Sequence, residues 1–173
     1  MATHGVRPRE QAPELDLPLV GGGTFRLADR DPERFTTVVF NRGLHCPVCQ
    51  AQLSELDRRL DDLTERGVEV VSVSGESAER ATRMHEEWGI ERLPLAYGLT
   101  EEGMREWGLF VSRGIDDNEP ETFNEPGLFL VRPDGTVYYE SILSMPVGRP
   151  QLDDLLGGID FWVDNDYPAR GEA

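Results

Sequence analysis

The chain has 173 residues, of which 38% are hydrophobic and 29% are charged, and its formal net charge at pH 7 is -16. This length is enough for one sizeable core, and the composition indicates a folded domain rather than a disordered chain. A surface this acidic repels phosphate backbones and anionic lipid headgroups, so we expect no nucleic-acid partner and no membrane partner.

The start of the chain is predicted to be a tail. Residues 1–13 contain arginines and prolines but no apolar stretch of the kind found in a secretory signal. No run of the sequence reaches the roughly 18 apolar residues that a membrane helix needs. We therefore expect an N-terminal tail over 1–13, a single domain over 14–173 and a cytoplasmic location.

Two short strands are predicted at the start of the domain. Leucines alternate with other residues over 15–19, three glycines follow, and the alternation resumes at Phe25 and Leu27. Period-two alternation around a glycine turn is typical of a β-hairpin. The next segment, 36–41, is β-branched and aromatic with a continuous apolar centre, which indicates a strand buried on both faces.

A long amphipathic helix is predicted over 46–66. Its apolar positions follow one another in steps of three and four residues, and they are Cys49, Leu53, Leu56, Leu60 and Leu63. Gly67 supplies a C-terminal stop, and the valine-rich run 68–73 then reads as a strand. A strand, a helix and a second strand in this order require a right-handed crossover and a parallel pair.

The rest of the chain predicts further helices and an antiparallel pair of strands. Helices are expected over 78–88 and after Thr100, and residues 127–143 read as strand, turn and strand. A second amphipathic stripe covers 152–163, and we expect it to be loosened at its two adjacent glycines. The sequence therefore predicts an α/β fold with a mixed central sheet, helices on both faces and an N-terminal β-hairpin.

One connection has a strong compositional bias. Residues 115–126 hold five acidic residues around two prolines. We interpret this segment as a solvated acidic loop, and a mobile lid near a functional site is the alternative.

The two cysteines carry the most specific chemical signal. Cys46 and Cys49 are spaced C-P-V-C and begin the helix that leaves the predicted buried strand. The first turn of a helix presents unpaired N–H groups and about half a positive charge, which stabilise a thiolate. In C-x-x-C pairs placed there, the thiol pKa falls from about 8.5 to roughly 3.5 to 7.5. Pro47 also suits the first turn, so the pair favours thiol–disulfide exchange.

Helical spacing predicts different roles for the two thiols. Cys49 continues the buried leucine face, whereas Cys46 lies one turn earlier, at the exposed start of the helix. We expect Cys46 to attack and Cys49 to resolve the mixed disulfide. Arg42 and His45 flank the pair, and each could lower a thiol pKa electrostatically. A packing or surface role is the alternative for His45.

Two other uses of the cysteine pair are disfavoured. A zinc site needs four ligands, and beyond the thiols the chain offers only His4, His45 and His85, without a paired spacing. A purely structural disulfide would close a very short loop and constrain little, and it would have to persist in a reducing compartment. We therefore expect no metal and no cofactor.

Several motifs together carry a family resemblance. They are R-G-L-H-C-P-V-C at 42–49 between V-V-F and V-E-V-V-S-V-S, L-P-L-A-Y-G-L at 93–99, P-G-L-F-L-V-R-P-D-G at 126–135, and the closing run that begins G-R-P-Q-L-D-D. With them, most of the chain resembles the peroxiredoxin-like AhpC/TSA (redoxin) family of the thioredoxin superfamily. The resemblance implies a thioredoxin-like fold and a redox-active dithiol.

Two patterns of that superfamily place the site residues differently. Peroxiredoxins use P-x-x-x-T-x-x-C, and with Cys49 in the last position, Cys46 stands for the threonine and Arg42 for the proline. Pro126 stands where their distant arginine is expected, so the groups that hold a peroxide differ. In the thioredoxin pattern Pro126 stands where the cis-proline packs beside the disulfide. Proton transfer to the resolving thiol then falls to His45 or water.

The sequence leaves three functions open. The first is a thiol–disulfide oxidoreductase that uses Cys46 and Cys49. The second is a thiol peroxidase that reduces hydroperoxides with either cysteine through a sulfenate and an internal disulfide. The third is a non-enzymatic redox-sensing binding module that uses the acidic loop for a partner. For the enzymes we expect a disulfide or hydroperoxide substrate and a thiol reductant, and the resemblance also allows a homodimer.

Overall fold

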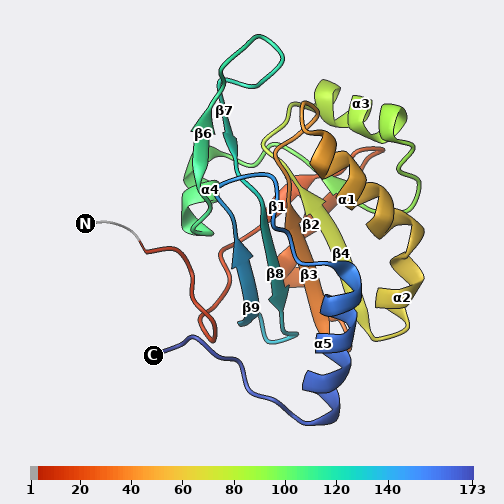
Figure 1. Cartoon of the computed structure of the whole chain (residues 1–173), viewed down its shortest axis with the longest axis vertical. Coiled ribbons are helices and arrows are strands. Elements are labelled where there is room, and N and C mark those ends of the chain that lie inside the picture. The colour runs from red at the N-terminus through yellow and green to blue at the C-terminus, as the bar shows by residue number, and fades with distance from the viewer. Residues whose placement is uncertain (1–3) are drawn as a thin grey trace.

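The centre of the molecule is a five-stranded mixed sheet. The computed structural model describes residues 4–173, so the first three residues of the predicted tail lie outside the described part. The strand order is β5–β4–β3–β8–β9 (Figure 1). β3, β4 and β5 are parallel, whereas β8 is antiparallel to β3 and β9 to β8. Their bounds are Phe35–Phe40 (β3), Val68–Val73 (β4), Leu95–Ala96 (β5), Gly127–Val131 (β8) and Val137–Ile142 (β9).

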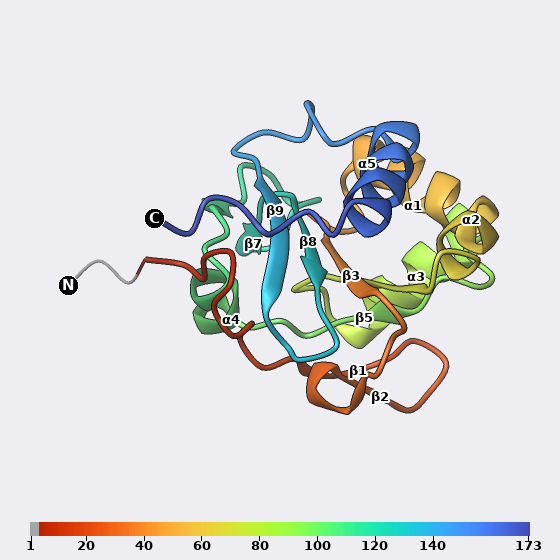
Figure 2. The same cartoon turned by 90° about the horizontal axis from the view of Figure 1, so that it is seen from below.

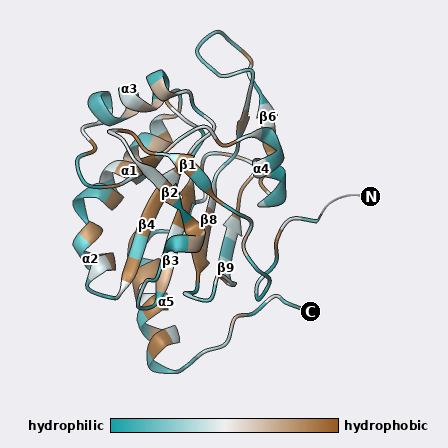
Figure 3. Cartoon of the chain, turned by 180° about the vertical axis from the view of Figure 1, so that it is seen from behind, coloured by the Kyte–Doolittle hydropathy of each residue, from teal (hydrophilic) through white to brown (hydrophobic). Residues whose placement is uncertain are grey.

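Helices cover both faces of this sheet, as the sequence predicts. One apolar core lies beneath α1, α2, α3 and α5, and the second lies beneath α4 and the hairpin of β1 and β2 (Figure 2). The helices are Pro47–Arg58 (α1), Leu60–Thr64 (α2), Ala78–Trp88 (α3), Glu101–Glu106 (α4) and Leu152–Asp164 (α5), and the hairpin strands are Asp16–Pro18 (β1) and Thr24–Arg26 (β2). A 3-10 turn, Leu27–Asp29, follows β2. Figure 3 shows that β3, β4 and β8 of the central sheet are mainly hydrophobic, whereas the edge strand β9 is less so.

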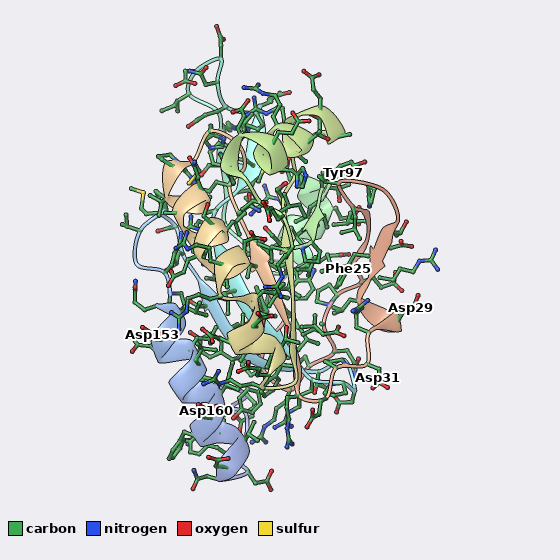
Figure 4. The ribbon with its side chains drawn as sticks, turned by 90° about the vertical axis from the view of Figure 1, so that its right-hand side faces the viewer. Phe25, Asp29, Asp31, Tyr97, Asp153 and Asp160 are labelled. Carbon is green, nitrogen blue, oxygen red and sulfur yellow. The ribbon has the colours of Figure 1, made fainter. Side chains whose placement is uncertain are left out.

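The helix predicted over 46–66 is in fact two helices. Arg59 separates α1 from α2 with φ of -107° and ψ of 22°. Its guanidinium donates to Asp62 at 2.9 Å and to Asp153 of α5 at 2.7 Å. The leucine pattern does not encode this break, because Leu60 and Leu63 pack against the core from the second piece as well. Figure 4 shows Asp153 and Asp160 along α5, which lies beside these helices.

The two glycines near the middle of the last helix do not loosen it, contrary to the sequence prediction. α5 runs without interruption through Gly157 and Gly158. Buried leucine and isoleucine side chains on either side hold the helix against the sheet, which outweighs the low helix propensity of glycine. A Cβ atom at Gly158 would lie 3.0 Å from the Trp162 ring, so the missing side chain lets that ring pack on the helix.

The acidic segment 115–126 is also more ordered than a solvated loop. Residues 115–121 form the tip of a projecting hairpin of β6 (Val111–Arg113) and β7 (Thr122–Asn124), drawn at the top of Figure 1, and β7 is itself part of the acidic segment. The tip is polar, but Glu125 is only 4% exposed. The prediction of a solvated loop is therefore wrong at Glu125, where the chain turns inward to enter β8. The alternative of a mobile lid stays a prediction.

The segment before the hairpin lies against the edge of the sheet. The Arg9 N–H donates to the Val137 carbonyl at 2.7 Å, and the Val137 N–H donates to the Glu10 carbonyl at 2.9 Å. Gly5 packs so closely on Gly108 that a Cβ atom at residue 5 would lie 2.2 Å from the Gly108 Cα. Residues 5–10 thus extend the layer beside β9, and a domain boundary at residue 13 stays a prediction.

Within residues 4–173, no helix combines the length and the hydropathy required to cross a lipid bilayer. The cytoplasmic location stays a prediction.

Candidate active site

The loop that joins β3 to α1 is held by buried polar groups. The Asn41 side chain donates to the Ser72 hydroxyl at 2.7 Å. Glu76, 2% exposed, accepts the Leu44 N–H at 3.3 Å and the Arg80 guanidinium at 2.7 Å. Gly43 has φ of +111°, and a Cβ atom there would lie 2.8 Å from Glu76 Cδ. Glycine at this position therefore allows the loop to turn tightly over Glu76 and to deliver the chain to the helix start.

Both cysteines lie in the first turn of α1, as their spacing predicts. Cys46 is the N-cap residue, and its Sγ accepts the backbone N–H of Cys49 at 3.2 Å. The Cys49 Sγ in turn accepts the backbone N–H of Arg42 at 3.3 Å. Two backbone donors thus point at the two sulfurs, and both sulfurs are free thiols. This arrangement stabilises a negative charge on sulfur.

The prediction that Cys46 is exposed is wrong. Cys46 is 1% exposed and Cys49 is 0% exposed. The helical pattern marks which side of α1 faces the sheet, but it gives no information about the segment that lies over the helix start. That segment precedes α5, and it places the Arg149 guanidinium against both sulfurs. Cys46 is therefore almost closed to solvent in this structure.

Arg149 is the main site residue that sequence reasoning missed. Its Nη2 lies 2.9 Å from the Cys49 Sγ and 3.9 Å from the Cys46 Sγ. The guanidinium is held in place by the Pro146 carbonyl, to which its Nε donates at 2.7 Å, and by the Gln52 side chain of α1. One feature of the sequence could have pointed to Arg149. It is a basic residue in a strongly acidic chain, and it stands in the G-R-P-Q-L run directly before the amphipathic stripe.

The two thiols have opposite acidities. A hydrogen bond from the Cys49 thiol is the largest cause that lowers the pKa of Cys46 to about 5, and it outweighs the opposing effect of burial. The Cys49 N–H, Arg42 and Arg149 lower it further. Burial raises the pKa of Cys49 well above its usual range, and its bond to Cys46 acts in the same direction. Near neutral pH the pair therefore holds one negative charge, on Cys46.

Arg42 is anchored by a buried acid from the β6–β7 hairpin. Its Nε lies 2.9 Å from Glu125 Oε2, and the side chains are 17% and 5% exposed. Glu125 also accepts the Ser112 hydroxyl at 2.8 Å. Burial opposes the charge of Arg42, but its contacts with Cys46 and Glu125 raise its pKa. The sequence predicted Glu125 only as part of an acidic loop. Its position directly before Pro126 was the feature that could have marked it as a site residue.

His45 does not act as a positive charge beside the thiols. Its side chain is 4% exposed and packs edge-on against Phe123, with ring centroids 4.6 Å apart. Its Nε2 lies 4.0 Å from a Glu119 carboxylate oxygen. Burial, together with the charge of Arg42, lowers the pKa of His45, so the imidazole is neutral at pH 7. A role as proton carrier stays a prediction.

Pro126 does not form the cis bond that a thioredoxin pattern suggests. Within residues 4–173 every peptide bond is trans. The backbone is held on both sides, since the Glu125 N–H donates to the Phe110 carbonyl at 2.8 Å and the Pro126 carbonyl accepts the Leu143 N–H at 3.0 Å. Pro126 is buried, and it lines a small hollow together with Arg149. The described residues bring together no cluster of three or more His, Cys, Asp or Glu side chains that could hold a metal ion.

Comparison with known proteins connects this geometry to a family. The model of the AhpC/TSA family matches residues 8–140. The peroxiredoxin 2 of Picrophilus torridus is 28% identical over 118 residues, which are 65% of this chain and 55% of that protein. A relative from Bacillus subtilis is 25% identical over 115 residues, which are 63% of this chain and 59% of the relative. The chain thus spans little more than half the length of these two proteins.

Solved structures show the same fold. The peroxiredoxin-like protein of Aquifex aeolicus superposes with a TM-score of 0.74 at 16% identity, over 92% of this chain and 90% of the other. The reduced 2-Cys peroxiredoxin of Plasmodium vivax superposes with a TM-score of 0.73 at 20% identity, over 92% and 84%. The fold is therefore the thioredoxin-like fold of peroxiredoxin structures, as the sequence predicts.

Proposed function

Since the chain belongs to the AhpC/TSA family, we propose that it is a thiol–disulfide oxidoreductase in which Cys46 attacks and Cys49 resolves. One observation carries this proposal. The two sulfurs share the first turn of α1, where Cys46 accepts the Cys49 N–H at 3.2 Å and has its pKa lowered to about 5. A thiolate at neutral pH beside a protonated second thiol is the arrangement that disulfide exchange requires.

The first step forms a mixed disulfide. The Cys46 thiolate attacks one sulfur of the substrate disulfide, a new S–S bond forms, and the substrate S–S bond breaks. The leaving sulfur departs as a thiolate and takes up a proton from water. The negative charge thereby leaves Cys46, so the main reason for the raised pKa of Cys49 apart from burial disappears.

The second step releases the substrate. Cys49 loses its proton to water, and its thiolate attacks the Cys46 sulfur. The Cys46–Cys49 bond forms, the mixed disulfide breaks, and the second substrate sulfur leaves as a thiol after protonation. Two electrons have passed to the substrate, and a thiol reductant must then reduce the internal disulfide. Arg149, 2.9 Å from the Cys49 Sγ, stabilises the thiolate of this step.

A second candidate function is reduction of hydroperoxides. Two guanidinium groups favour it, because Arg149 and Arg42 both contact the sulfur pair and could stabilise charge on a peroxide oxygen. The Cys46 thiolate would attack one oxygen, the O–O bond would break, and the leaving oxygen would take up a proton. The resulting sulfenic acid would react with the Cys49 thiol to give the internal disulfide and water.

Two steady-state assays separate the candidates. We expect the protein to accelerate insulin reduction by dithiothreitol, which is the activity of a disulfide reductase. Rapid consumption of hydrogen peroxide or an organic hydroperoxide with the same reductant would instead support the peroxidase. Failure in both assays, with the thiols fully reduced and the protein folded, would contradict both enzymes and favour a redox-sensing binding module.

Trapping tests the assignment of the two thiols. We expect Cys49→Ser to accumulate a mixed disulfide with substrate, because the resolving thiol is absent. Cys46→Ser should form none, although it keeps a side-chain acceptor at the N-cap position. Equal trapping by the two variants, or trapping by Cys46→Ser alone, would overturn the assignment.

The proposed partners follow from this chemistry. They are a disulfide substrate, with a hydroperoxide as the alternative, and a thiol reductant that regenerates the dithiol. A homodimer is also proposed, and gel filtration with light scattering would test it.

A further inference from the structure

The Arg42 side chain connects the thiols to the β6–β7 hairpin. Its backbone N–H donates to the Cys49 Sγ at 3.3 Å, so the start of the side chain is fixed beside the sulfurs. The guanidinium lies several rotatable bonds further out and donates to the Cys46 sulfur. An arginine side chain has many rotamers, and holding its end in one place requires further contacts. The hairpin supplies them.

Glu125 holds one edge of the guanidinium. Its Oε2 lies 2.9 Å from the Arg42 Nε, and its Oε1 accepts a hydrogen bond from the Arg42 Nη2 at 3.4 Å. Contacts to two different carboxylate oxygens restrict the rotation of a guanidinium more than a single contact does.

Phe123 of the same hairpin holds the face of the guanidinium. The Arg42 Cζ lies 5.0 Å from the centre of the Phe123 ring, a distance at which an aromatic face attracts a cation. Phe123 is buried, so packing fixes the ring itself. Residues two apart in an extended chain face the same side, which explains why Phe123 and Glu125 both reach Arg42.

The position of the Glu125 carboxylate is set without the thiols. Its Oε1 accepts the Ser112 hydroxyl of β6 at 2.8 Å, and its backbone N–H donates to the Phe110 carbonyl at 2.8 Å. Pro126 follows directly, and a proline restricts the backbone of the residue before it. The carboxylate is therefore a fixed point on which the guanidinium of Arg42 is aligned.

The charge of Glu125 by itself acts against the thiolate. A carboxylate near a thiol disfavours the negatively charged form of the thiol, whereas a guanidinium favours it. The other guanidinium at the sulfurs, that of Arg149, is held by neutral acceptors, the Gln52 side chain and the Pro146 carbonyl. Any favourable effect of the acid Glu125 on the thiolate must therefore pass through Arg42.

Other groups also face Cys46. Cys49 lies in the same turn of α1 and stays protonated, His45 directly precedes Cys46 and is neutral at pH 7, and Arg149 approaches from the segment before α5. These groups are the same in all the variants described below, so a change at Cys46 reports on Arg42 and Glu125.

We propose that Glu125 is a positioning residue. It holds the Arg42 guanidinium against the Cys46 sulfur, so the β6–β7 hairpin sets the reactivity of a thiol that belongs to another part of the fold. This inference rests on the proposed function in one respect, namely that Cys46 is the nucleophile.

The first test uses the opposite signs of the two effects. Glu125→Gln keeps the size of the side chain, removes its charge and replaces one acceptor oxygen with an N–H2 group. If Glu125 positions Arg42, the guanidinium turns toward water and the pKa of Cys46 rises from about 5 by about one unit. Loss of the charge alone would instead lower this pKa. A lowered or unchanged pKa in the folded variant would overturn the proposal.

The ultraviolet absorbance of the thiolate, followed against pH, measures this pKa without an enzyme assay. A protein that fails in the disulfide-reduction and peroxide assays can therefore still confirm or contradict the role of Glu125. Glu121→Gln, at an exposed position of the same hairpin, removes an equal charge and should not raise the pKa of Cys46. An equal rise in Glu121→Gln would show that the contact with Arg42 is not the cause and would contradict the proposal.

A double-mutant cycle tests whether Glu125 acts through Arg42. Arg42→Gln should raise the pKa of Cys46 by about one unit, and adding Glu125→Gln should then raise it no further. A second rise of equal size in the double variant would mean that Glu125 acts independently of Arg42, against the proposal. Glu125→Asp keeps the charge but shortens the side chain by one methylene group, so it should also raise the pKa of Cys46. An unchanged pKa in Glu125→Asp would show that the reach of the carboxylate is irrelevant, and this result also excludes a positioning role.

The reaction of the reduced protein with dipyridyl disulfide gives a kinetic readout. A rise of the Cys46 pKa from about 5 to about 6 leaves the thiolate dominant at pH 7 but lowers its fraction about fivefold at pH 5. We therefore expect Glu125→Gln to lower the second-order rate constant about fivefold at pH 5 and to leave it nearly unchanged at pH 7. An equal loss at both pH values would indicate a purely structural role for Glu125 and would overturn the proposal.

Discussion

The two ends of α5 stand beside regions of different chemical character, one built around sulfur and guanidinium groups and the other around aromatic rings. Before its first turn, Arg149 approaches the sulfurs of Cys46 and Cys49, and the thiols are buried. Near its last turn, Trp162 lines an open cavity together with Tyr138, Tyr139 and Tyr167. A chain with a net charge of -16 therefore places two guanidinium groups, those of Arg42 and Arg149, against its thiols. Net charge describes the long-range field, but the placement of a few groups decides the chemistry of each site.

The largest expected effect separates the two ends completely. Cys46→Ser should reduce turnover at least about 10³-fold, because the proposed nucleophile is lost, while the packing of the Trp162 ring at the far end of α5 stays the same. Disulfide-reduction kinetics and the NMR resonance of the Trp162 indole N–H measure the two quantities on one protein. A shift of that resonance in the folded variant would contradict the independence of the two ends.

The next effect concerns the acid that anchors Arg42. Glu125→Gln removes the partner of a mostly buried guanidinium, and we expect the free energy of unfolding to fall by about 2 kcal/mol, less than for a fully buried pair because Arg42 keeps some contact with water. Urea unfolding measures this. Glu121→Gln, at an exposed position of the same hairpin, is the control and should stay within about 0.5 kcal/mol of the wild type. Equal stability of the two variants would show that the Glu125 pair contributes nothing.

A smaller effect is expected from the guanidinium over the sulfurs. Arg149→Gln should raise the pKa of Cys46 from about 5 by about one unit, because one of the charges that stabilise the thiolate is removed. The ultraviolet absorbance of the thiolate, followed against pH, measures the pKa without depending on access to the sulfur. Arg58→Gln, at an exposed position of α1, should leave it unchanged. An unchanged Cys46 pKa in Arg149→Gln would show that Arg149 does not stabilise the thiolate.

The smallest effect is a pH dependence of stability. The pKa of Cys46 is about 5 in the folded chain and higher in the unfolded chain, so its contribution is complete above the unfolded value and is lost as pH falls through 5. The stability difference between the reduced wild type and Cys46→Ser should therefore grow with pH, by at most about 1.4 kcal/mol per unit between pH 5 and 8. Urea unfolding of both proteins across this range measures it, and a constant difference would contradict the lowered pKa.

Local patterns predicted most of the fold and the centre of the site. Alternation predicted the hairpin, and β-branched or apolar runs predicted the central strands. Thr100 marked the start of α4, and its side chain accepts the Gly103 N–H at 3.1 Å. The C-P-V-C spacing placed both sulfurs at a helix start. These features depend on residues within a few positions of one another, and backbone geometry then fixes their arrangement.

The errors arose where distant segments decide the outcome. Cys46 is covered from a segment about one hundred residues further along the chain, and Glu125 is buried because Arg42 and Ser112 meet it. The break at Arg59 accompanies a bond to Asp153 of α5. No periodicity within one element carries this information.

The sequence by itself determined the α/β class, the dithiol and its place at a helix start, because periodicity and capping act over one or two turns. Only the tertiary structure decided that both sulfurs are buried, that Arg149 and the Arg42–Glu125 pair surround them, and that an aromatic cavity lies at the far end of α5. The physical reason is the sequence separation of the interacting groups. Burial and ion pairing depend on which side chains, distant along the chain, come into contact, and only the folded structure determines those contacts.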